Sequence, residues 1–304
     1  MSENTVLVGS ASWTDKSLVE CGRFYPPHCR TAEDRLRYYA SQFPMTEVDS
    51  SYYGIPVPHN AQLWAERTPA GFVFNIKAFR LFTGHQTTPA VLGKDLAAAL
   101  GPEPPKVLYY KDTPQEIREE LWRRFLLALE PLKAAGKLGA THFQFAPWVI
   151  RNRDGLAHVE HCVEKMARHL VSVEFRNATW LDEERSEKTL AFERNLGVVH
   201  TIVDGPKGFA NSVPDVWAVT NPRLAIVRLH GRNAETWNKK GMSTSSERFD
   251  YWYSEGELSE MVPKVRELAK QAERVHVIFN NNREDQAQVG GRLMMKLLAE
   301  HGKR

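Results

Sequence analysis

Short apolar runs alternate with longer amphipathic runs along almost the whole chain, and this alternation constrains the fold more than any single motif. The short runs are rich in β-branched and aromatic residues and predict eight strands, at Thr5–Ser10, Thr46–Ser51, Phe72–Lys77, Thr141–Phe145, Val171–Arg176, Val198–Val203, Leu224–His230 and Val275–Asn280. The longer runs predict helices after most strands, at Ala32–Phe43, Asn60–Arg67, Glu116–Ala135, Leu156–His169, Glu183–Asn195, Glu257–Glu273 and a last one ending near His301. Strands that alternate with helices pair in parallel, and eight such units predict a closed (β/α)8 barrel.

An open doubly wound sheet is the structural alternative, and it would normally carry a glycine-rich phosphate turn after its first strand. The sequence there is GSASW (Gly9–Trp13), which is not G-x-G-x-x-G, and the chain has no P-loop. Although 304 residues could also form two domains, no low-complexity segment or charge block marks a linker. We therefore expect a single TIM-like α/β barrel over residues 1–304. Two irregular stretches, Ala78–Thr113 and Gly231–Gly256, are expected as long loops after strands three and seven.

The composition is that of a globular protein, with 42% hydrophobic residues, 25% charged residues and a formal net charge of +3. Such a chain can bury a full core, and its near-balanced charge excludes an all-over basic surface but allows a local basic groove. No apolar run is long enough to cross a bilayer, and the first five residues lack the features of a signal peptide. Three cysteines suit reduced thiols better than a disulfide framework. We expect a cytoplasmic protein with no membrane partner.

Polar side chains recur near the C-terminal ends of the predicted strands. Because side chains alternate along a strand, the polar faces are Glu47, Asp49 and Ser51; Asn75 and Lys77; Ser172, Glu174 and Arg176; His200 and Asp204; Arg228, His230 and Arg232; and Asn280, Asn281 and Asn282. Charges from several strands at one end of a barrel are costly to bury unless they are paired or functional. They indicate either a ligand site or an ion-pair layer in which Asp49 and Glu174 neutralise the nearby cations.

The residue types at this end suit an anionic ligand. Arginine forks bind phosphate or carboxylate, and four cations are expected to hold the anion: Lys77, Arg176, Arg228 and Arg232. Asp49 and Glu174 would be acid/base carboxylates, and His230 would carry protons. Barrels often bind phosphate at the loops after strands seven and eight. Gly290 and Gly291, in the second of these loops, would either admit an anion to their N–H groups or serve only helix packing.

Aromatic residues cluster near the same end, where they could stack on bases or sugar rings. About half of them are expected to close the core beneath the long loops instead. Tyr53, Trp180 and Trp237 lie at strand ends or in long loops and are the better binding candidates. The full set of expected ligand-binding residues is Ser12, Trp13, Tyr53, Lys77, Arg176, Trp180, Arg228, Arg232, Trp237, Asn280 and Asn281.

No zinc-type cluster of Cys and His, no nucleophile elbow and no redox cofactor motif is present in the sequence. No cofactor is therefore predicted. A divalent ion remains an alternative, because barrels assemble metal ligands from separate strands. The residues that could hold it are Glu47, Asp49, Glu174 and His230.

Eight stretches form an ordered set along the chain: VGSASW (Val8–Trp13), FYP (Phe24–Pro26), TEVDSSYYGIP (Thr46–Pro56), FVFNIKAFRLFTGHQ (Phe72–Gln86), FQFAPW (Phe143–Trp148), VEFRNATW (Val173–Trp180), VRLHGR (Val227–Arg232) and FNNN (Phe279–Asn282). This set resembles the YecE-like family of bacterial proteins, domain of unknown function number 72. The resemblance covers nearly the whole chain and implies a single TIM-like barrel without supplying an activity. DNA binding has been suggested for the family from the shape of its barrel. Ala11 and Ala146 stand where relatives often have glycine and proline.

The leading functional hypothesis is an enzyme of hydrolase or lyase type acting on an anionic ligand, phosphate-bearing or nucleotide-like, at the C-terminal mouth of the barrel. One alternative is a glycoside hydrolase using Asp49 and Glu174, which needs their carboxyl groups roughly 5–10 Å apart with open space between them. The other is a nucleic-acid-binding module without catalysis, using the basic loop Arg232–Arg248. Such binding would weaken steeply with salt.

Overall fold

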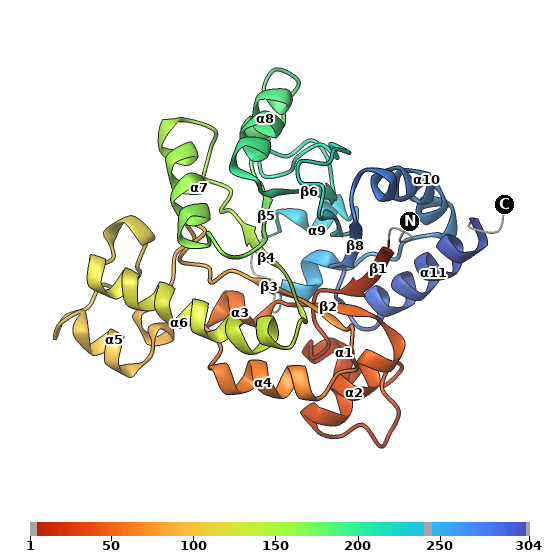
Figure 1. Ribbon diagram of the computed structural model, residues 1–304, viewed down its shortest axis with the longest axis horizontal. Helices are drawn as coiled ribbons and strands as arrows, with labels where there is room; N and C mark the ends of the chain where they lie inside the picture. The colour runs from red at the N-terminus through yellow and green to blue at the C-terminus, as the bar shows by residue number, and fades with distance from the viewer. Residues whose placement is uncertain (1–4, 240–244, 302–304) are drawn as a thin grey trace.

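Eight parallel strands close into a barrel in chain order (Figure 1). The computed structural model describes residues 5–239 and 245–301. The strands are β1 (Thr5–Ser10), β2 (Met45–Val48), β3 (Val73–Lys77), β4 (Leu138–Gln144), β5 (Val171–Glu174), β6 (Val199–Asp204), β7 (Ala225–Leu229) and β8 (Arg274–Phe279). Each overlaps one of the eight predicted strands, and β1 pairs with β8 to close the ring. The predicted (β/α)8 TIM-like fold is therefore confirmed.

Helices surround the barrel (Figure 1). The α-helices are α1 (Lys16–Glu20), α2 (Ala32–Gln42), α3 (Ser50–Tyr53), α4 (Pro58–Glu66), α5 (Lys94–Ala99), α6 (Gln115–Ala134), α7 (Arg153–Lys165), α8 (Ser186–Leu196), α9 (Ala234–Trp237), α10 (Glu255–Gln271) and α11 (Gln286–His301). Capping boxes begin α2 at Thr31 and α10 at Ser254, each satisfying free N–H groups of the first turn. Residues 205–224, which join β6 to β7, contain no helix. Among the described residues no helix has the length and apolarity to cross a membrane.

The long loops predicted after β3 and β7 are present and carry short helices of their own. The first contains α5 and two 3₁₀ helices, η1 (Pro89–Leu92) and η2 (Tyr110–Asp112). The second contains α9 and η4 (Ser245–Phe249), and its residues 240–244 lie outside the described part of the chain. Both loops leave the C-terminal ends of their strands, so they lie on the face where barrels bind ligands.

Inside the barrel, apolar side chains form a layer nearer the N-terminal ends of the strands, which we call the floor, and polar side chains form the next layer toward the C-terminal ends. The floor is a cluster that includes Met45, Val73, Ala140, Val199, Ile226 and Ile278. Two residues further along each strand, on the same face, the residues are polar and buried: Glu47, Asn75, His142, Thr201, Arg228 and Asn280. Strand register then places neighbours side by side, with Glu47 opposite Asn75 and Gln144 opposite Glu174. The interior therefore changes from apolar to charged toward the C-terminal mouth.

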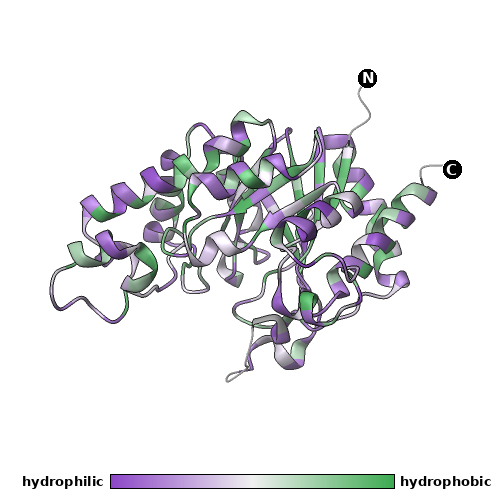
Figure 2. Cartoon of the chain, turned by 90° about the horizontal axis from the view of Figure 1, so that it is seen from below, coloured by the Kyte–Doolittle hydropathy of each residue, from purple (hydrophilic) through white to green (hydrophobic). Residues whose placement is uncertain are grey.

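The main apolar core lies between the barrel wall and the helices, and Figure 2 shows polar colour spread over the outer helices around apolar strands. Gly290 and Gly291 lie within α11, where helical N–H groups are bonded along the helix. A Cβ atom at Gly290 would lie 2.7 Å from Cε1 of Phe279, and one at Gly291 would lie 2.9 Å from Cε1 of Phe43. The glycine pair therefore lets α11 pack closely on Phe279 of β8 and on Phe43 at the end of α2. This is the helix-packing alternative and not an anion site.

Candidate functional site

Glu174, at the end of β5, is the centre of the polar cluster in the barrel mouth. Its fully buried Oε2 accepts from Nη1 of Arg228 at 2.6 Å. Its Oε1 accepts from Nε2 of Gln144 at 2.6 Å and from Nη1 of Arg176 at 3.0 Å, and lies 3.2 Å from Nε2 of His230. Burial alone would raise the pKa of Glu174, but the positive charge of Arg228 and the other donors hold that pKa well below its usual range. Glu174 is therefore an ionised carboxylate whose two oxygens are both occupied.

Arg228, on β7, joins two carboxylates inside the barrel. Besides Glu174, its guanidinium contacts Glu47, with Nη2 2.6 Å from Oε1. All three side chains are fully buried. Burial would lower the pKa of Arg228, but the two carboxylates outweigh burial and raise it. The ion-pair layer considered from the sequence is present, and it includes Glu47, which was expected on an inward polar face and as a possible metal ligand.

His230 is held as a neutral imidazole. The amide nitrogen of Asn280 lies 2.7 Å from Nδ1 of His230. With Asn280 donating to Nδ1, the ring proton is on Nε2 and is donated to Glu174. Burial lowers the pKa of His230 to about 3, although Glu174 opposes the shift. Both ring nitrogens are engaged, so in this arrangement His230 positions Glu174 and has no free nitrogen for the proton transfer expected from the sequence.

Asp49 and Lys77 form a second ion pair, nearer to solvent. Nζ of Lys77 lies 2.8 Å from Oδ1 of Asp49 and 4.6 Å from the centroid of the Tyr52 ring. The Asp49 side chain is 20% exposed. Burial raises the pKa of Asp49, but Lys77 and then Arg228 outweigh burial and lower that pKa. Beyond the ion pair with Lys77, neither oxygen of Asp49 makes a hydrogen bond to any described residue. Oε2 of Glu47 also has no partner, but Glu47 is fully buried, so Asp49 is the more accessible of the two carboxylates.

Three cations surround His85 on the β3 and β5 side of the mouth. Burial, then Lys77, Arg80 and Arg176, lower the pKa of His85 to about 3. Arg80 lies over the Tyr52 ring at 5.2 Å, and Arg176 lies over the Trp237 ring at 4.8 Å. Arg80 and His85 were not predicted. They could have been found from their position in the segment that directly follows β3, where barrels commonly carry binding residues.

Arg232 is separated from this cluster by its own carboxylate partners. Its guanidinium contacts Asp204 at 2.8 Å and Glu257, on α10, at 3.1 Å. These contacts hold the loop after β7 against the end of β6 and the start of α10. His200 does not point into the mouth as expected, because its Nδ1 lies 3.0 Å from Oε2 of Glu193 on α8.

The aromatic candidates divide between the core and the surface. Trp180 is fully buried, stacked on Phe175 at 3.8 Å, and donates from Nε1 to the Val149 carbonyl. Trp13 packs edge-on against Trp64 and Phe74. Neither ring is therefore free to stack on a ligand, which corrects the expectation for both.

The other predicted residues lie closer to the mouth. Trp237 is buried beneath Arg176, whereas Tyr53 is 50% exposed. Ser12, directly after β1, has a φ of 134°, a strained conformation for a residue with a side chain. The buried Asn281 donates from its side-chain amide to the Tyr251 carbonyl, so it orders the loop after β7.

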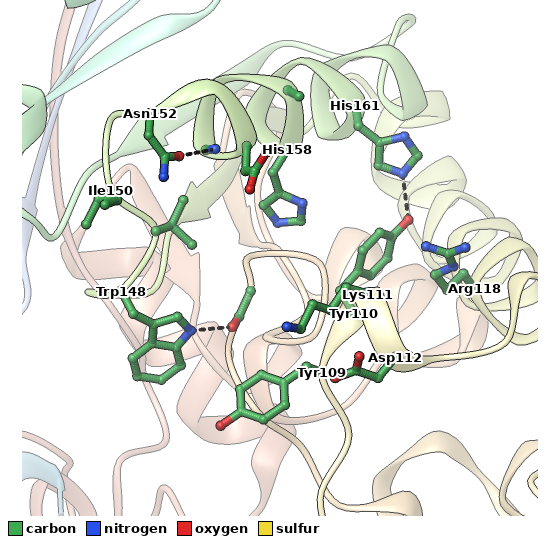
Figure 3. A pocket seen from close by; sticks show the side chains of 15 residues that line it. Tyr109, Tyr110, Lys111, Asp112, Arg118, Trp148, Ile150, Asn152, His158 and His161 are labelled. Carbon is green, nitrogen blue, oxygen red and sulfur yellow. Dashed lines mark hydrogen bonds between the residues drawn. The ribbon is translucent and has the colours of Figure 1, made fainter.

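A cavity of about 920 Å³ opens beside the mouth (Figure 3). Trp148 and Tyr109 lie together at one end of it, with ring centroids 6.5 Å apart, and His161 and Arg118 lie at the other. The Trp148 ring is 54% exposed but held in place, because its Nε1 donates to the Gly84 carbonyl at 2.9 Å. The ring of His85 links this cavity to the mouth, 5.7 Å from Trp148 and 5.2 Å from Tyr52.

The metal alternative has no assembled site in the described part of the chain. No group of three or more His, Cys, Asp and Glu side chains is arranged there to hold an ion. Two of the four residues considered, Glu47 and Glu174, bind Arg228 instead.

Comparisons with known proteins agree on one family. The family model described as protein of unknown function DUF72 matches residues 7–304. UPF0759 protein YunF of Bacillus subtilis (strain 168) is 30% identical over 295 residues, which cover 96% of this chain and 94% of YunF. A crystal structure of a DUF72 family protein from Enterococcus faecalis V583 superposes with a TM-score of 0.79 at 26% identity, covering 97% and 96% of the two chains. Another, from Thermotoga maritima MSB8, gives 0.75 at 28% identity, covering 97% and 99%.

The matching motifs and the barrel agree with these comparisons over nearly the whole chain. The chain therefore belongs to the DUF72 family and has the TIM-barrel fold of its solved members.

Proposed function

We propose that this barrel is an enzyme of hydrolase or lyase type acting on an anionic, nucleotide-like ligand at the C-terminal mouth. The observation that carries the proposal is that Lys77 and Arg176 each contact one carboxylate yet keep further N–H groups without an acceptor among the described residues. Their side chains are 8% and 13% exposed, so a ligand can reach them with little competition from water. Donors to an oxyanion are stronger in such a partly dehydrated setting.

Asp49 is the best-supported general base. It is ionised, it is partly exposed, and it lies beside Lys77, where an anion would bind. Glu174 and His230 act as positioning residues in this scheme, because the buried carboxylate fixes Arg176 and is itself fixed by Arg228 and His230.

The aromatic end of the cavity favours a ligand that carries a flat ring. Trp148 offers an exposed, fixed indole face, and the rings of His85 and Tyr52 connect it with Lys77. Stacking of a base on an aromatic side chain contributes about 1–3 kcal/mol. A nucleotide with its phosphate at Lys77 and Arg176 and its base at Trp148 uses both features.

Each alternative has a weaker basis in the geometry. A glycosidase needs a protonated carboxylic acid and open space between two carboxyl groups, whereas Glu174 is ionised and surrounded by donors. The nucleic-acid alternative rests on Arg232–Arg248, of which residues 240–244 lie outside the described part and Arg232 is paired with Asp204 and Glu257. Salt dependence of DNA binding still tests it.

Calorimetric titration with AMP tests the anion site. We expect Lys77→Met and Arg176→Gln each to weaken AMP binding by about tenfold or more, since a hydrogen bond to a charged group is worth about 1.5–3 kcal/mol. Arg194→Ala is the matched control, because Arg194 is an exposed arginine on α8 that forms no ion pair with the described residues. Equal affinity in all four proteins, or no binding of AMP to the unmodified chain, contradicts the proposal.

A second titration tests the ring subsite. Trp148→Ala should weaken binding of AMP but leave binding of ribose 5-phosphate unchanged, because only AMP carries a base. Trp252 is a matched control, since it is 52% exposed and does not line the cavity. If Trp148→Ala and Trp252→Ala bind AMP equally well, the base does not lie at Trp148.

A further inference from the structure

A second, smaller cavity lies at the opposite end of the barrel. Its volume is about 320 Å³, within the range of small-molecule pockets. Residues from the beginnings of four strands line it: Leu138 and Gly139 of β4, Leu170 before β5, Leu224 before β7, and Arg274 and His276 of β8. It therefore opens on the N-terminal face, remote from the loops that surround the mouth.

The charges around this cavity are not balanced as they are at the mouth. Arg168, Arg223 and Arg274 all line it, and none has a carboxylate within ion-pair distance among the described residues. Lys133 also lines it and lies 3.7 Å from Glu130. Glu273 is the one acidic residue among the lining residues of this cavity. The excess of guanidinium groups creates a positive potential that an anion would neutralise.

A buried histidine gives an independent sign that a polar partner is missing. His276 is 1% exposed, lines the cavity, and has no hydrogen-bond partner on either ring nitrogen within the described structure. His169, which also lines it, makes no hydrogen bond either, but its Nε2 lies 4.0 Å from Oε1 of Glu130, so the missing partner is clearest at His276. Buried polar atoms are normally paired, and unpaired ones are destabilising unless water or a ligand completes them.

We propose that this cavity is a binding site for a small phosphate-bearing anion of about the size of pyrophosphate. Arg168, Arg223 and Arg274 supply planar donor forks that match phosphate oxygens. His276 supplies a further buried nitrogen for a hydrogen bond at the inner end. The site is separate from the mouth and does not depend on the function proposed there. Since barrel chemistry is carried out at the C-terminal face, the bound anion regulates or stabilises the protein and is not the substrate.

Calorimetry with inorganic pyrophosphate, in a buffer free of phosphate, tests the site. We expect Arg223→Ala and the double variant Arg168→Ala/Arg274→Ala to weaken binding by about tenfold or more. Arg153→Ala is the matched control, because Arg153 is an exposed arginine without an ion pair among the described residues, at the start of α7 near the opposite face. Arg176→Gln separates the two sites, since it should remove only the pyrophosphate that binds at the mouth. Loss of all binding in Arg176→Gln, or unchanged binding in Arg223→Ala, overturns the proposal.

Two further measurements make the result specific to this place. Pyrophosphate should shift the ¹⁵N resonances of the His276 ring, assigned by their disappearance in His276→Leu, and unshifted resonances at saturation overturn the proposal. In thermal unfolding without added anion, Arg223→Ala should be as stable as the unmodified chain or more so, because it removes repulsion between like charges. It should then lose the rise in Tm that pyrophosphate gives the unmodified chain. A variant that is less stable without the anion and gains the full rise contradicts a binding role.

Discussion

His230 donates to Glu174 from Nε2, 3.2 Å from Oε1, and receives the Asn280 amide on Nδ1 at 2.7 Å. This relationship fixes one neutral tautomer of the ring beneath the barrel mouth. The ring contacts a carboxylate and yet stays uncharged, because burial lowers its pKa by more than Glu174 raises it, and the positive charge of Arg228 acts in the same direction as burial. An exposed His–Glu pair favours the charged imidazole, whereas the folded state here favours the neutral one. The folded protein should therefore lose stability as the pH falls and His230 tends to take up a proton.

We expect the free energy of unfolding to fall as pH decreases from 7 toward 5. His230 and His276 are buried, with pKa values lowered to about 3, whereas unfolding returns them to about 6.5. The unfolded chain thus binds more protons below pH 6.5, so the stabilising contribution is complete above pH 6.5 and is lost progressively toward pH 3. Between pH 7 and pH 5.5 the loss is about 2.5 kcal/mol for these two residues together. The buried His85 and His158, whose pKa values are lowered to about 3 and about 4, add to it in the same direction. Urea unfolding at a series of pH values, without phosphate, measures it.

The variant His276→Leu provides the control for this effect. It removes one of these buried titrating groups and both unpaired ring nitrogens of that residue. The decrease between pH 7 and pH 5.5 should therefore be smaller than in the unmodified chain by about 1.2 kcal/mol, which is the share of one such histidine. A decrease of the same size in both proteins would show that His276 does not stay neutral in the folded state.

Glu174→Gln should be strongly destabilising. Replacing the carboxylate leaves Arg228 buried with one counter-charge, on Glu47. Removing one member of a buried ion pair usually costs about 3–5 kcal/mol. Urea unfolding measures the loss, and the double variant Glu174→Gln/Arg228→Met should cost less than the sum of its two single changes, because each single change already breaks the same buried ion pair. If the losses of stability from the two single changes simply add, Glu174 and Arg228 do not stabilise the protein through their ion pair.

The sequence pattern was sufficient to predict the barrel because two features indicate most strands. One is the β-branched and aromatic composition of the strand, and the other is the amphipathic helix that follows it. It also placed Asp49, Lys77, Glu174, Arg228 and His230 on inward faces, since alternation along a strand depends only on its register. What alternation cannot give is the pairing between strands that are far apart in sequence. Glu47 and Arg228 are 181 residues apart and meet across the barrel.

Trp180 and Arg80 show the other limit of sequence reasoning. Trp180 lies close after β5, where binding residues are common, but its ring fills space behind Phe175. Arg80 lies close after β3 and reaches the mouth through its contact with Tyr52. Both follow a strand end, and only the packing of the loops decides which side chain faces the ligand and which faces the core.

Gly290→Ala should destabilise the protein although alanine favours helices. The new Cβ would lie 2.7 Å from Cε1 of Phe279, which is fully buried and has no room to move. Overpacking of this kind costs about 1–3 kcal/mol, more than the roughly 1 kcal/mol gained in helix propensity. Gly256→Ala in α10 is the control, because the nearest atom to its Cβ is 4.0 Å away, and it should stabilise. Thermal unfolding of the two variants should give Tm shifts of opposite sign, and equal shifts would refute close packing of α11.

Asp49→Asn should separate binding from turnover at the mouth. It removes the negative charge 2.8 Å from Nζ of Lys77, so AMP should bind about fivefold more tightly, corresponding to roughly 1 kcal/mol of lost repulsion. The same change removes the general base, so hydrolysis of a phosphate ester such as bis(p-nitrophenyl) phosphate should fall to the background rate. Calorimetry and a spectrophotometric assay measure the two effects on one preparation. Weaker AMP binding in Asp49→Asn would mean that Asp49 serves to orient Lys77, and unchanged turnover would remove it as the base. The opposite signs for affinity and rate are what a carboxylate beside a bound anion must produce.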